Sequence, residues 1–353
     1  CRRPDLSLMS IQHQALPAFG LDQAPYAYGA PVCQADFKTF PQDFVVEEVL
    51  GFEPCGEGEH LFLLLQTDDQ NTRFTVKCLS SLFGLPQRAI TYSGLKDRRG
   101  LTSQWFSLHL PGKNPEPDAV AMAEQGITLL RYARHNKKLR IGTHKTNRFQ
   151  IVLRNLVGKD QLEQRLALIK ESGVPNYFGA QRFGHDTGNI EEAMHWVEQN
   201  ALPREKALRS RALTTLRSWW FNGMLGQRVL AQSWTRWQAE DPILLDGSQS
   251  YFQESAWSEV LEARYQSGDI HIGGWLPCAE HEGLPAPISA FLRLAAIKAE
   301  PRSLCLRPLN FQWQWCNDQL HLQFQLPKGA FATTLLRELT QLNDLSGLQQ
   351  NKG

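Results

Sequence analysis

The sequence predicts an α+β fold in which a sheet domain is interrupted by a second, more helical domain. Short segments with alternating apolar and polar residues dominate positions 34–154. Longer helical periodicity begins after Gly173, and alternating segments rich in aromatic residues return at 311–326. The chain has 353 residues, of which 42% are hydrophobic, so it can bury a substantial core in two domains or in one domain with a large insertion.

The strands are placed by alternation and by the turns that bound it. Residues 35–40 and 44–49 read as two strands separated by a Pro-Gln-Asp turn, and their closeness in the chain favours an antiparallel pair. The Gly- and Glu-rich stretch 51–59 is expected to be a loop. Further strands are expected at 60–66, 89–93, 103–109, 127–133, 148–154, 311–315 and 321–326.

Helices are expected where apolar residues recur three and four positions apart. The first begins at Asn71-Thr72, which can cap it, and ends at Gly84. Others are expected at 160–171, 191–199, 207–235 and 288–299, with a last one starting near Ala330.

The simplest domain organisation is a sheet domain formed by residues 31–172 and 306–353, with residues 173–305 inserted into it. The insertion contains a Pro- and Gly-rich tract at 268–287. Residues 1–30 are expected to be a poorly ordered leader without a targeting signal.

Composition excludes several classes of protein. The 37 Lys and Arg residues nearly balance the 36 Asp and Glu residues, and 18 Phe with 10 Trp is far from the composition of a disordered chain. The longest apolar run near a strand, at 61–65, is much shorter than the roughly 20 residues that a membrane helix needs. Seven scattered cysteines without a CxxC pair indicate a reducing cytoplasm, and the histidines lack the spacing of metal ligands, so no bound metal is expected.

The common enzyme motifs are also absent from the sequence. It contains no GxxxxGK[ST] phosphate loop, no GxGxxG after a strand and no GxSxG nucleophile elbow. Their absence weakens the NTPase, dehydrogenase, hydrolase and common methyltransferase interpretations together.

A basic segment at 131–148 is the most unusual feature, with seven Lys or Arg residues and no acid. Cations spaced along an extended segment can each neutralise a phosphate, so the segment indicates contact with RNA. The alternative is a solvated basic loop balanced by acids elsewhere. A second basic stretch, 204–217, leads into Trp219-Trp220-Phe221, which suits RNA stacking but is more typical of a core.

Two further segments combine charge with glycine. Gly94-Leu95-Lys96-Asp97-Arg98-Arg99-Gly100 places one acid among three cations, which would keep the Asp97 carboxylate ionised for use as a nucleophile or base. The alternative is a charged turn with an incidental aspartate. Residues 174–184 end in Gly-Ala-Gln-Arg-Phe-Gly, either a tight turn that presents Arg182 to RNA or a hinge that packs Phe178 and Phe183 inward.

Five segments together resemble the TruD family of tRNA pseudouridine synthases. They are 40–48 (FPQDFVVEE), 94–98 (GLKDR), 138–142 (KLRIG) with Asn147, 174–184 (VPNYFGAQRFG) and 326–339 (LPKGAFATTLLREL). They occur in the family's order, and the stretch Tyr177–Gly184 is the most specific of them. The resemblance covers residues 36–184 and 311–339, while most of 195–305 carries little of it. One departure is Thr146, where the family commonly has glycine before the asparagine; a β-branched residue disfavours a left-handed backbone there.

The resemblance implies a cofactor-free isomerisation of uridine 13 in the D arm of tRNA to pseudouridine. It implies a catalytic domain shared in outline with other pseudouridine synthases, a mixed, mainly antiparallel sheet flanked by helices, interrupted by a family-specific α/β domain.

The same resemblance assigns roles to particular residues. By matching position, Asp97 is the catalytic carboxylate, while Phe44, Asn147 and Phe331 line the substrate pocket. The two rings could contact the flipped nucleotide and the amide could hydrogen-bond a uracil or ribose edge. The cations that could contact RNA are Lys96, Arg98, Arg134, Lys137, Lys138, Arg140, Lys145 and Arg182.

Two other interpretations remain to be weighed. A non-catalytic RNA-binding or RNA-folding protein on the same scaffold would use the same basic and aromatic residues. Asp97 favours the enzyme over the pure binder, because a pure binder gains nothing from a carboxylate in a phosphate-facing surface. An RNA methyltransferase would need a glycine-rich cofactor loop, which the sequence lacks.

Overall fold

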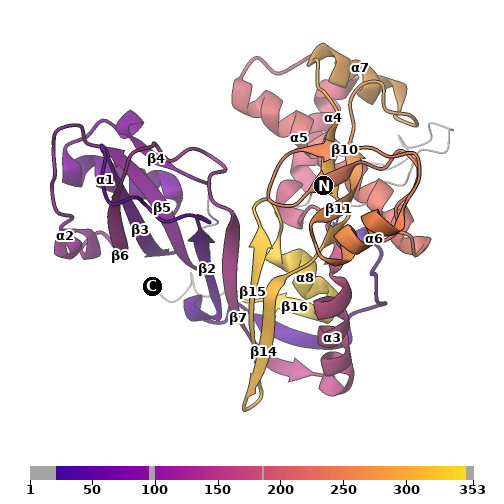
Figure 1. Ribbon diagram of the computed structural model, residues 1–353, viewed down its shortest axis with the longest axis horizontal. Helices are drawn as coiled ribbons and strands as arrows, with labels where there is room; N and C mark the ends of the chain where they lie inside the picture. Colours follow the sequence, from indigo (N-terminus) through magenta and orange to yellow (C-terminus); the bar gives the residue numbers. More distant parts are fainter. Residues whose placement is uncertain (1–20, 95–99, 185–186, 347–353) are drawn as a thin grey trace, which may run out of the picture. The chain divides into compact units, whose positions relative to one another are not determined.

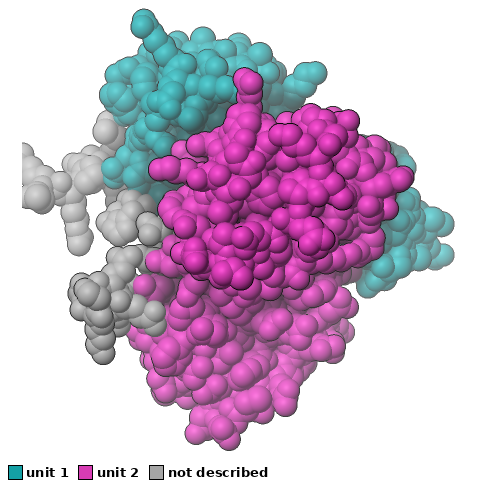
Figure 2. All heavy atoms as spheres, turned by 90° about the vertical axis from the view of Figure 1, so that its left-hand side faces the viewer, with its two compact units in different colours: residues 1–30, 174–306 teal, residues 31–173, 307–353 magenta. Residues whose placement is uncertain are grey.

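The computed structural model describes residues 21–94, 100–184 and 187–346 (Figure 1). Contacts divide the chain into two compact units, shown in different colours in Figure 2. Unit 1 comprises residues 1–30 and 174–306, and unit 2 comprises residues 31–173 and 307–353. No helix in the described part of the chain is long and apolar enough to cross a membrane.

Unit 2 is built on a sheet that has ten strands within the described residues. Its main path runs through β14 (Leu309–Cys316), β15 (Gln319–Pro327), β7 (Thr146–Val157), β2 (Phe44–Val49), β5 (Leu101–His109), β3 (His60–Asp68) and β6 (Ile127–His135). Off this path lie β1 (Cys33–Phe37), β4 (Ile90–Tyr92) and β16 (Thr340–Asp344). Only β2–β5 and β1–β16 are parallel among these described pairs, so the predicted mixed, mainly antiparallel sheet is confirmed.

The expected antiparallel pairing of the first two strands is wrong. Both β1 and β2 pair with β7, β2 over Thr146–Ile151 and β1 farther along, at Arg154 and Val157. β7 is 12 residues long, so two short strands can pair with different stretches of it. The other partner of β2 is β5, and that of β1 is the strand β16, which the sequence did not predict.

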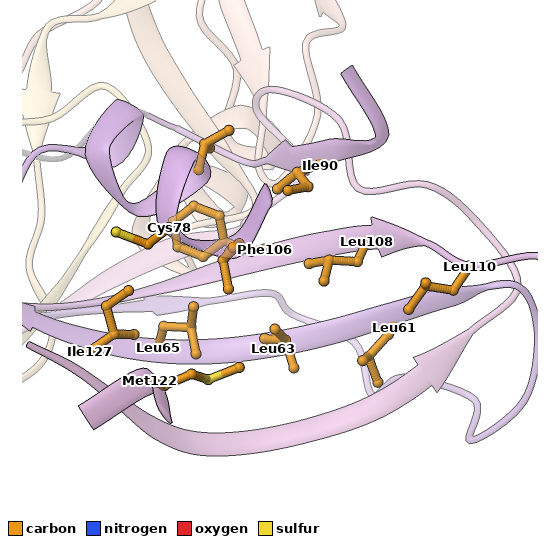
Figure 3. Close-up of a cluster of buried hydrophobic side chains, with 12 residues drawn as sticks. Leu61, Leu63, Leu65, Cys78, Ile90, Phe106, Leu108, Leu110, Met122 and Ile127 are labelled. Atoms are coloured by element: carbon orange, nitrogen blue, oxygen red, sulfur yellow. The ribbon is translucent and has the colours of Figure 1, made fainter. Parts of the chain in front are cut away.

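One face of the sheet in unit 2 is covered by α1 (Thr72–Phe83) and α2 (Ala119–Ala123). Asn71 caps α1 by accepting a hydrogen bond from Phe74 N at 2.8 Å, and Gly84 ends it at φ 59°, as the sequence predicts. β3 is apolar on both faces. Leu61, Leu63 and Leu65 pack toward α1 and α2 (Figure 3), while its alternate residues join a second cluster with Trp105 and Leu139.

Two further helices complete unit 2. They are α3 (Leu162–Ser172) and α8 (Ala332–Leu339), and the Arg165 guanidinium donates to the Glu338 carbonyl oxygen at 2.7 Å. α8 runs directly into β16, whose first residue Thr340 pairs with Cys33 of β1.

Unit 1 combines four described helices with a small antiparallel sheet. The helices are α4 (Gly188–Glu198), α5 (Lys206–Leu230), α6 (Glu259–Gln266) and α7 (Ala286–Leu294). The sheet order is β10 (Tyr251–Phe252), β9 (Ile243–Leu245), β11 (Ile270–Leu276) and β12 (Glu300–Ser303). β8 (Val174–Pro175) pairs with β13 (Cys305–Leu306), so the chain enters and leaves the unit as two paired strands.

Two helices expected in unit 1 end earlier than predicted. The helix expected over 207–235 ends at Leu230, and the helix expected over 288–299 ends at Leu294. The Pro- and Gly-rich tract contains the buried strand β11, in which Gly273 and Gly274 sit where a Cβ would collide with side chains of β9 and α5. Glycine here allows close packing of the strand.

Part of the expected leader is ordered. Residues 21–23 form a 3₁₀ turn, Leu21 and Ala24 are buried, and the Tyr177 hydroxyl donates to the Pro25 carbonyl oxygen at 3.2 Å. Residues 1–20 lie outside the described residues.

Candidate functional site

Three of the predicted site residues lie outside the described part of the chain. Lys96, Asp97 and Arg98 belong to residues 95–99, between Gly94 after β4 and Gly100 before β5. The surroundings of the predicted site are therefore built from the residues on either side and from the neighbouring strands of unit 2.

The sheet register brings the other predicted pocket residues to neighbouring strands. Asn147 on β7 lies opposite Glu48 of β2 and opposite Leu326 of β15. Directly paired residues share a face of the sheet, so Glu48, Asn147 and Leu326 lie on one face. Phe44 occupies the same face of β2 as Glu48, four residues earlier, and Phe331 follows β15 at the start of α8.

Phe44 is buried among aromatic and basic side chains. Only 7% of it is exposed, and its ring meets the Phe37 ring edge-on at 5.4 Å between centroids. The Lys38 ammonium lies 4.2 Å from the centroid of the Phe44 ring, a cation–π contact that no sequence motif indicates. Gly100 packs on the same residue, because a Cβ at position 100 would fall 2.6 Å from the Phe44 carbonyl oxygen.

Asn147 and Phe331 differ in exposure. Asn147 is buried, and the preceding Thr146 begins β7 and donates its hydroxyl to Gln325 Oε1 at 3.0 Å. Thr146 thus needs no left-handed backbone where the family commonly has glycine. Phe331 is half-buried. The nearby Lys328 ammonium donates to the Gly142 carbonyl oxygen at 2.6 Å, which joins the segment after β15 to the turn before β7.

A compact polar cluster holds the residues that precede position 95. The Ser93 hydroxyl accepts a hydrogen bond from the His144 backbone N–H at 2.7 Å and lies 2.6 Å from His144 Nδ1. The Gly142 N–H donates to the Ser93 carbonyl oxygen at 2.6 Å, and the Gln104 amide donates to the Gly94 carbonyl oxygen. No single sequence motif indicates this cluster, because its members come from three separate segments.

The basic segment divides into paired and exposed cations. Arg131 is paired with Glu53 at 2.5 Å, and the Arg134 guanidinium donates to the Lys113 carbonyl oxygen and to Asn114 Oδ1. Four other cations of the segment have exposed side chains: Lys137, Lys138, Arg140 and Lys145. The segment also does not form a single loop, since Arg131 and Arg134 lie in β6.

In unit 1, Arg182 lies in a 3₁₀ turn at 180–182 and is half-buried. Its guanidinium is 5.6 Å from the Phe178 ring centroid, and the Arg302 guanidinium is 3.9 Å from the same centroid. The buried Asn222 amide fixes Phe178 by accepting from its N–H and donating to its carbonyl oxygen. Burial lowers the pKa of Arg182, while burial and the charge of Arg182 lower the pKa of Arg302 to about 9.

The burial of aromatic side chains in unit 1 tests two predictions. Phe178 and Phe183 are buried, as the inward-packing interpretation of the 174–184 segment requires. Trp220 and Phe221 are buried in α5, and Trp219 packs against the core formed with α4 and α7, so this aromatic run belongs to the core.

Comparison with known proteins identifies the family. The family model described as tRNA pseudouridine synthase D (TruD) matches residues 20–195. The chain is 39% identical over 338 residues to the tRNA pseudouridine synthase D of Aeromonas hydrophila, covering 92% of this chain and 96% of that protein. It is 40% identical over 336 residues to the protein of the same name from Stutzerimonas stutzeri, covering 90% and 96%.

A solved structure shows the same fold. A crystal structure from Methanosarcina mazei, of a protein described as a candidate tRNA pseudouridine synthase D, matches with a TM-score of 0.64 at 21% identity. The match covers 91% of this chain and 97% of that chain. The identity of 39 to 40% over at least 90% of the chain shows that it belongs to the tRNA pseudouridine synthase D (TruD) family.

Proposed function

We propose that this protein isomerises a uridine of tRNA, uridine 13 in the D arm, to pseudouridine without a cofactor. The observation that carries the proposal is the 39 to 40% identity, over at least 90% of the chain, to bacterial tRNA pseudouridine synthase D proteins, together with the Gly-Leu-Lys-Asp-Arg segment at 94–98. Asp97 of that segment is the proposed catalytic carboxylate.

The reaction requires little from the protein beyond one carboxylate and a shaped pocket. The glycosidic bond from C1′ to N1 breaks, the uracil turns while it is held, and a bond from C5 to C1′ forms. The C5 proton then leaves and N1 takes up a proton, so the product is an isomer of the substrate. Three routes start from Asp97: attack on C1′, attack on C6, or removal of the 2′ proton. Each needs an ionised carboxylate, which the neighbouring Lys96 and Arg98 charges favour.

The pocket must also compensate for extrusion of the base. Flipping a nucleotide out of an RNA fold costs a few kcal/mol, and stacking on an aromatic side chain returns about 1 to 3 kcal/mol per base. Phe331 is half-buried and is the better candidate for stacking. Phe44 is buried under Lys38 and Phe37, so it would shape the pocket wall, while the Asn147 amide would hydrogen-bond the nucleotide.

The exposed cations Lys137, Lys138, Arg140 and Lys145 support a tRNA contact in unit 2. A net charge of +1 makes this local concentration of positive charge, rather than the protein's total charge, the source of RNA attraction. Lys96, Arg98, Arg134 and Arg182 are proposed as additional contacts.

We further infer that unit 2 is the catalytic domain and unit 1 the family-specific insert, and that the protein acts in the cytoplasm. The two stretches of unit 2 contain Asp97 and every proposed pocket residue. Six described cysteines are free thiols, which fits a reducing compartment.

A transcript test separates catalysis from binding. An unmodified tRNA transcript with uridine at position 13 and a matched transcript with cytidine there are incubated with the protein, and pseudouridine is mapped chemically. Pseudouridine at position 13 of the first transcript alone supports the proposal. Tight binding of both without pseudouridine would instead favour the non-catalytic RNA-binding interpretation.

A further inference from the structure

One buried imidazole joins the two chain segments that lead to the proposed catalytic and base-binding residues. Ser93 lies four residues before Asp97, and His144 lies three residues before Asn147. The Ser93 side chain is fully buried and His144 is 6% exposed. Three hydrogen bonds link the segments: His144 N to Ser93 Oγ at 2.7 Å, the His144 Nδ1 contact to Ser93 Oγ at 2.6 Å, and Gly142 N to the Ser93 carbonyl oxygen at 2.6 Å.

Glu48 extends this link to a third strand. Its side chain is fully buried, and one carboxylate oxygen accepts the Trp105 N–H at 3.0 Å. The other oxygen lies 3.9 Å from His144 Nδ1. Glu48 is also the cross-strand partner of Asn147. The His144 imidazole therefore lies next to a carboxylate on the same face of the sheet as the proposed base-binding amide. Buried polar clusters of this kind fix a single arrangement when their members are hydrogen-bonded.

We propose that His144 is a positioning residue for the isomerisation, acting through Ser93 and Glu48 to set the distance between Ser93-Gly94, from which the chain continues to Asp97, and the start of β7. The inference rests on the proposed function, because its consequence is alignment of Asp97 with a nucleotide held at Asn147. A misplacement of about 1 Å between a reacting group and its substrate can cost on the order of a hundredfold in rate. The exposed cations of the basic segment are not members of this cluster, so the cluster should act on turnover and not on tRNA binding.

The test compares two variants that break the link with one that restores part of it. His144→Leu removes the imidazole, and Ser93→Ala removes the hydroxyl that the imidazole contacts. His144→Asn places an amide near the position of Nδ1 and can hydrogen-bond Ser93 again. We expect kcat to fall about tenfold or more in the first two variants, with KM for tRNA within about twofold of wild type, and to recover at least in part in His144→Asn.

The same sheet offers a matched control. Ser107 Oγ on β5 lies 3.3 Å from His60 Nδ1 on β3, a second serine–histidine contact, which involves neither Ser93 nor His144. Ser107→Ala should lower the urea midpoint of unfolding about as much as Ser93→Ala while leaving kcat at the wild-type value. Equal kcat in Ser93→Ala and Ser107→Ala, or a KM that rises as kcat falls, would overturn the positioning role. If the wild-type protein itself produced no pseudouridine, the proposed function would fail, which is a distinguishable result.

Discussion

Arg154 donates two hydrogen bonds, of 2.9 and 2.8 Å, to the carboxylate of Asp43, the residue immediately before Phe44. The Asp43 side chain is 2% exposed and also accepts the Phe40 N–H at 3.0 Å. These hydrogen bonds join β7 to the 3₁₀ turn Pro41–Asp43, and they fix where β2 begins and therefore where Phe44 lies. Asp43 belongs to the Phe-Pro-Gln-Asp-Phe segment of the family resemblance, but no sequence pattern indicates that Arg154, far along the chain, is its partner.

Asp43→Asn should destabilise unit 2, because it leaves the half-buried Arg154 charge without its carboxylate. Because Arg154 is partly exposed, the cost should be smaller than that of breaking a fully buried ion pair, about 1.5 to 3 kcal/mol, which urea unfolding would detect as a lower midpoint. Asp318→Asn is the control, since it breaks an exposed pair with Lys159 and should leave the midpoint nearly unchanged. Equal midpoints for the two variants would show that the Asp43 pair does not anchor β2.

Truncating Phe331 should mainly lower activity, whereas truncating Phe44 should mainly lower stability. Phe331→Ala removes the proposed stacking surface, so kcat/KM should fall about tenfold to a hundredfold with little loss of stability. Phe44→Ala opens a cavity beneath Lys38 and Phe37 and should cost about 3 to 5 kcal/mol of folding free energy. Steady-state kinetics and urea unfolding on both variants check this. A stable, inactive Phe44→Ala would make Phe44 a direct nucleotide contact instead.

The exposed part of the basic segment should determine the salt dependence of tRNA binding. Combined substitution of Lys137, Lys138 and Arg140 by Ala should weaken binding and reduce the slope of log K against log salt by roughly 0.7 to 0.9 for each phosphate that is no longer neutralised. Arg131→Ala is the control from the same segment, because its charge is already paired with Glu53. A triple variant with the wild-type slope would show that these cations do not meet phosphate.

Unit 1 should lose stability as the pH falls below 6.5 because of His281. Burial lowers the pKa of this histidine below its ordinary value of 6.5, and Glu282 opposes the shift in part. Between those two pKa values the unfolded chain binds a proton that the folded chain does not, so the stabilisation present above 6.5 is lost on acidification.

Unfolding at about pH 7.5 and about pH 5.5 tests this linkage. His281→Gln should lose less stability between the two values than wild type, whereas replacing the exposed His195 by Gln should leave the wild-type difference intact. An identical pH response in wild type and His281→Gln would contradict the assignment.

Local patterns in the sequence predict most elements of unit 2, because their signals lie within a few residues of each other. The Asn71 cap, the Gly84 stop and the strand expected at 60–66, with its apolar run at 61–65, each depend on neighbours in the chain, and the structure confirms all three. Strand pairing depends on partners far away. β16 pairs with β1 from the other end of the chain, and nothing near residues 340–344 indicates it.

The site shows the same division between local and distant information. The family resemblance selects Asp97, Phe44, Asn147 and Phe331 by motif. It assigns no role to Lys38, His144 or Ser93, because their contacts with one another and with Phe44 join residues that are not neighbours in any one motif. Burial also cannot be read from the motif: Phe44 reads as a pocket ring, but its surroundings resemble a core.

The most direct test of the account is tritium release from tRNA that carries [5-³H]uridine, measured with wild-type protein and Asp97→Asn at equal tRNA occupancy. Formation of the C5–C1′ bond expels the label, so the account predicts release with wild type, none with Asp97→Asn, and a modified position that maps to residue 13. Release by Asp97→Asn at the wild-type rate, or no release by a folded wild-type protein that binds tRNA, would contradict it.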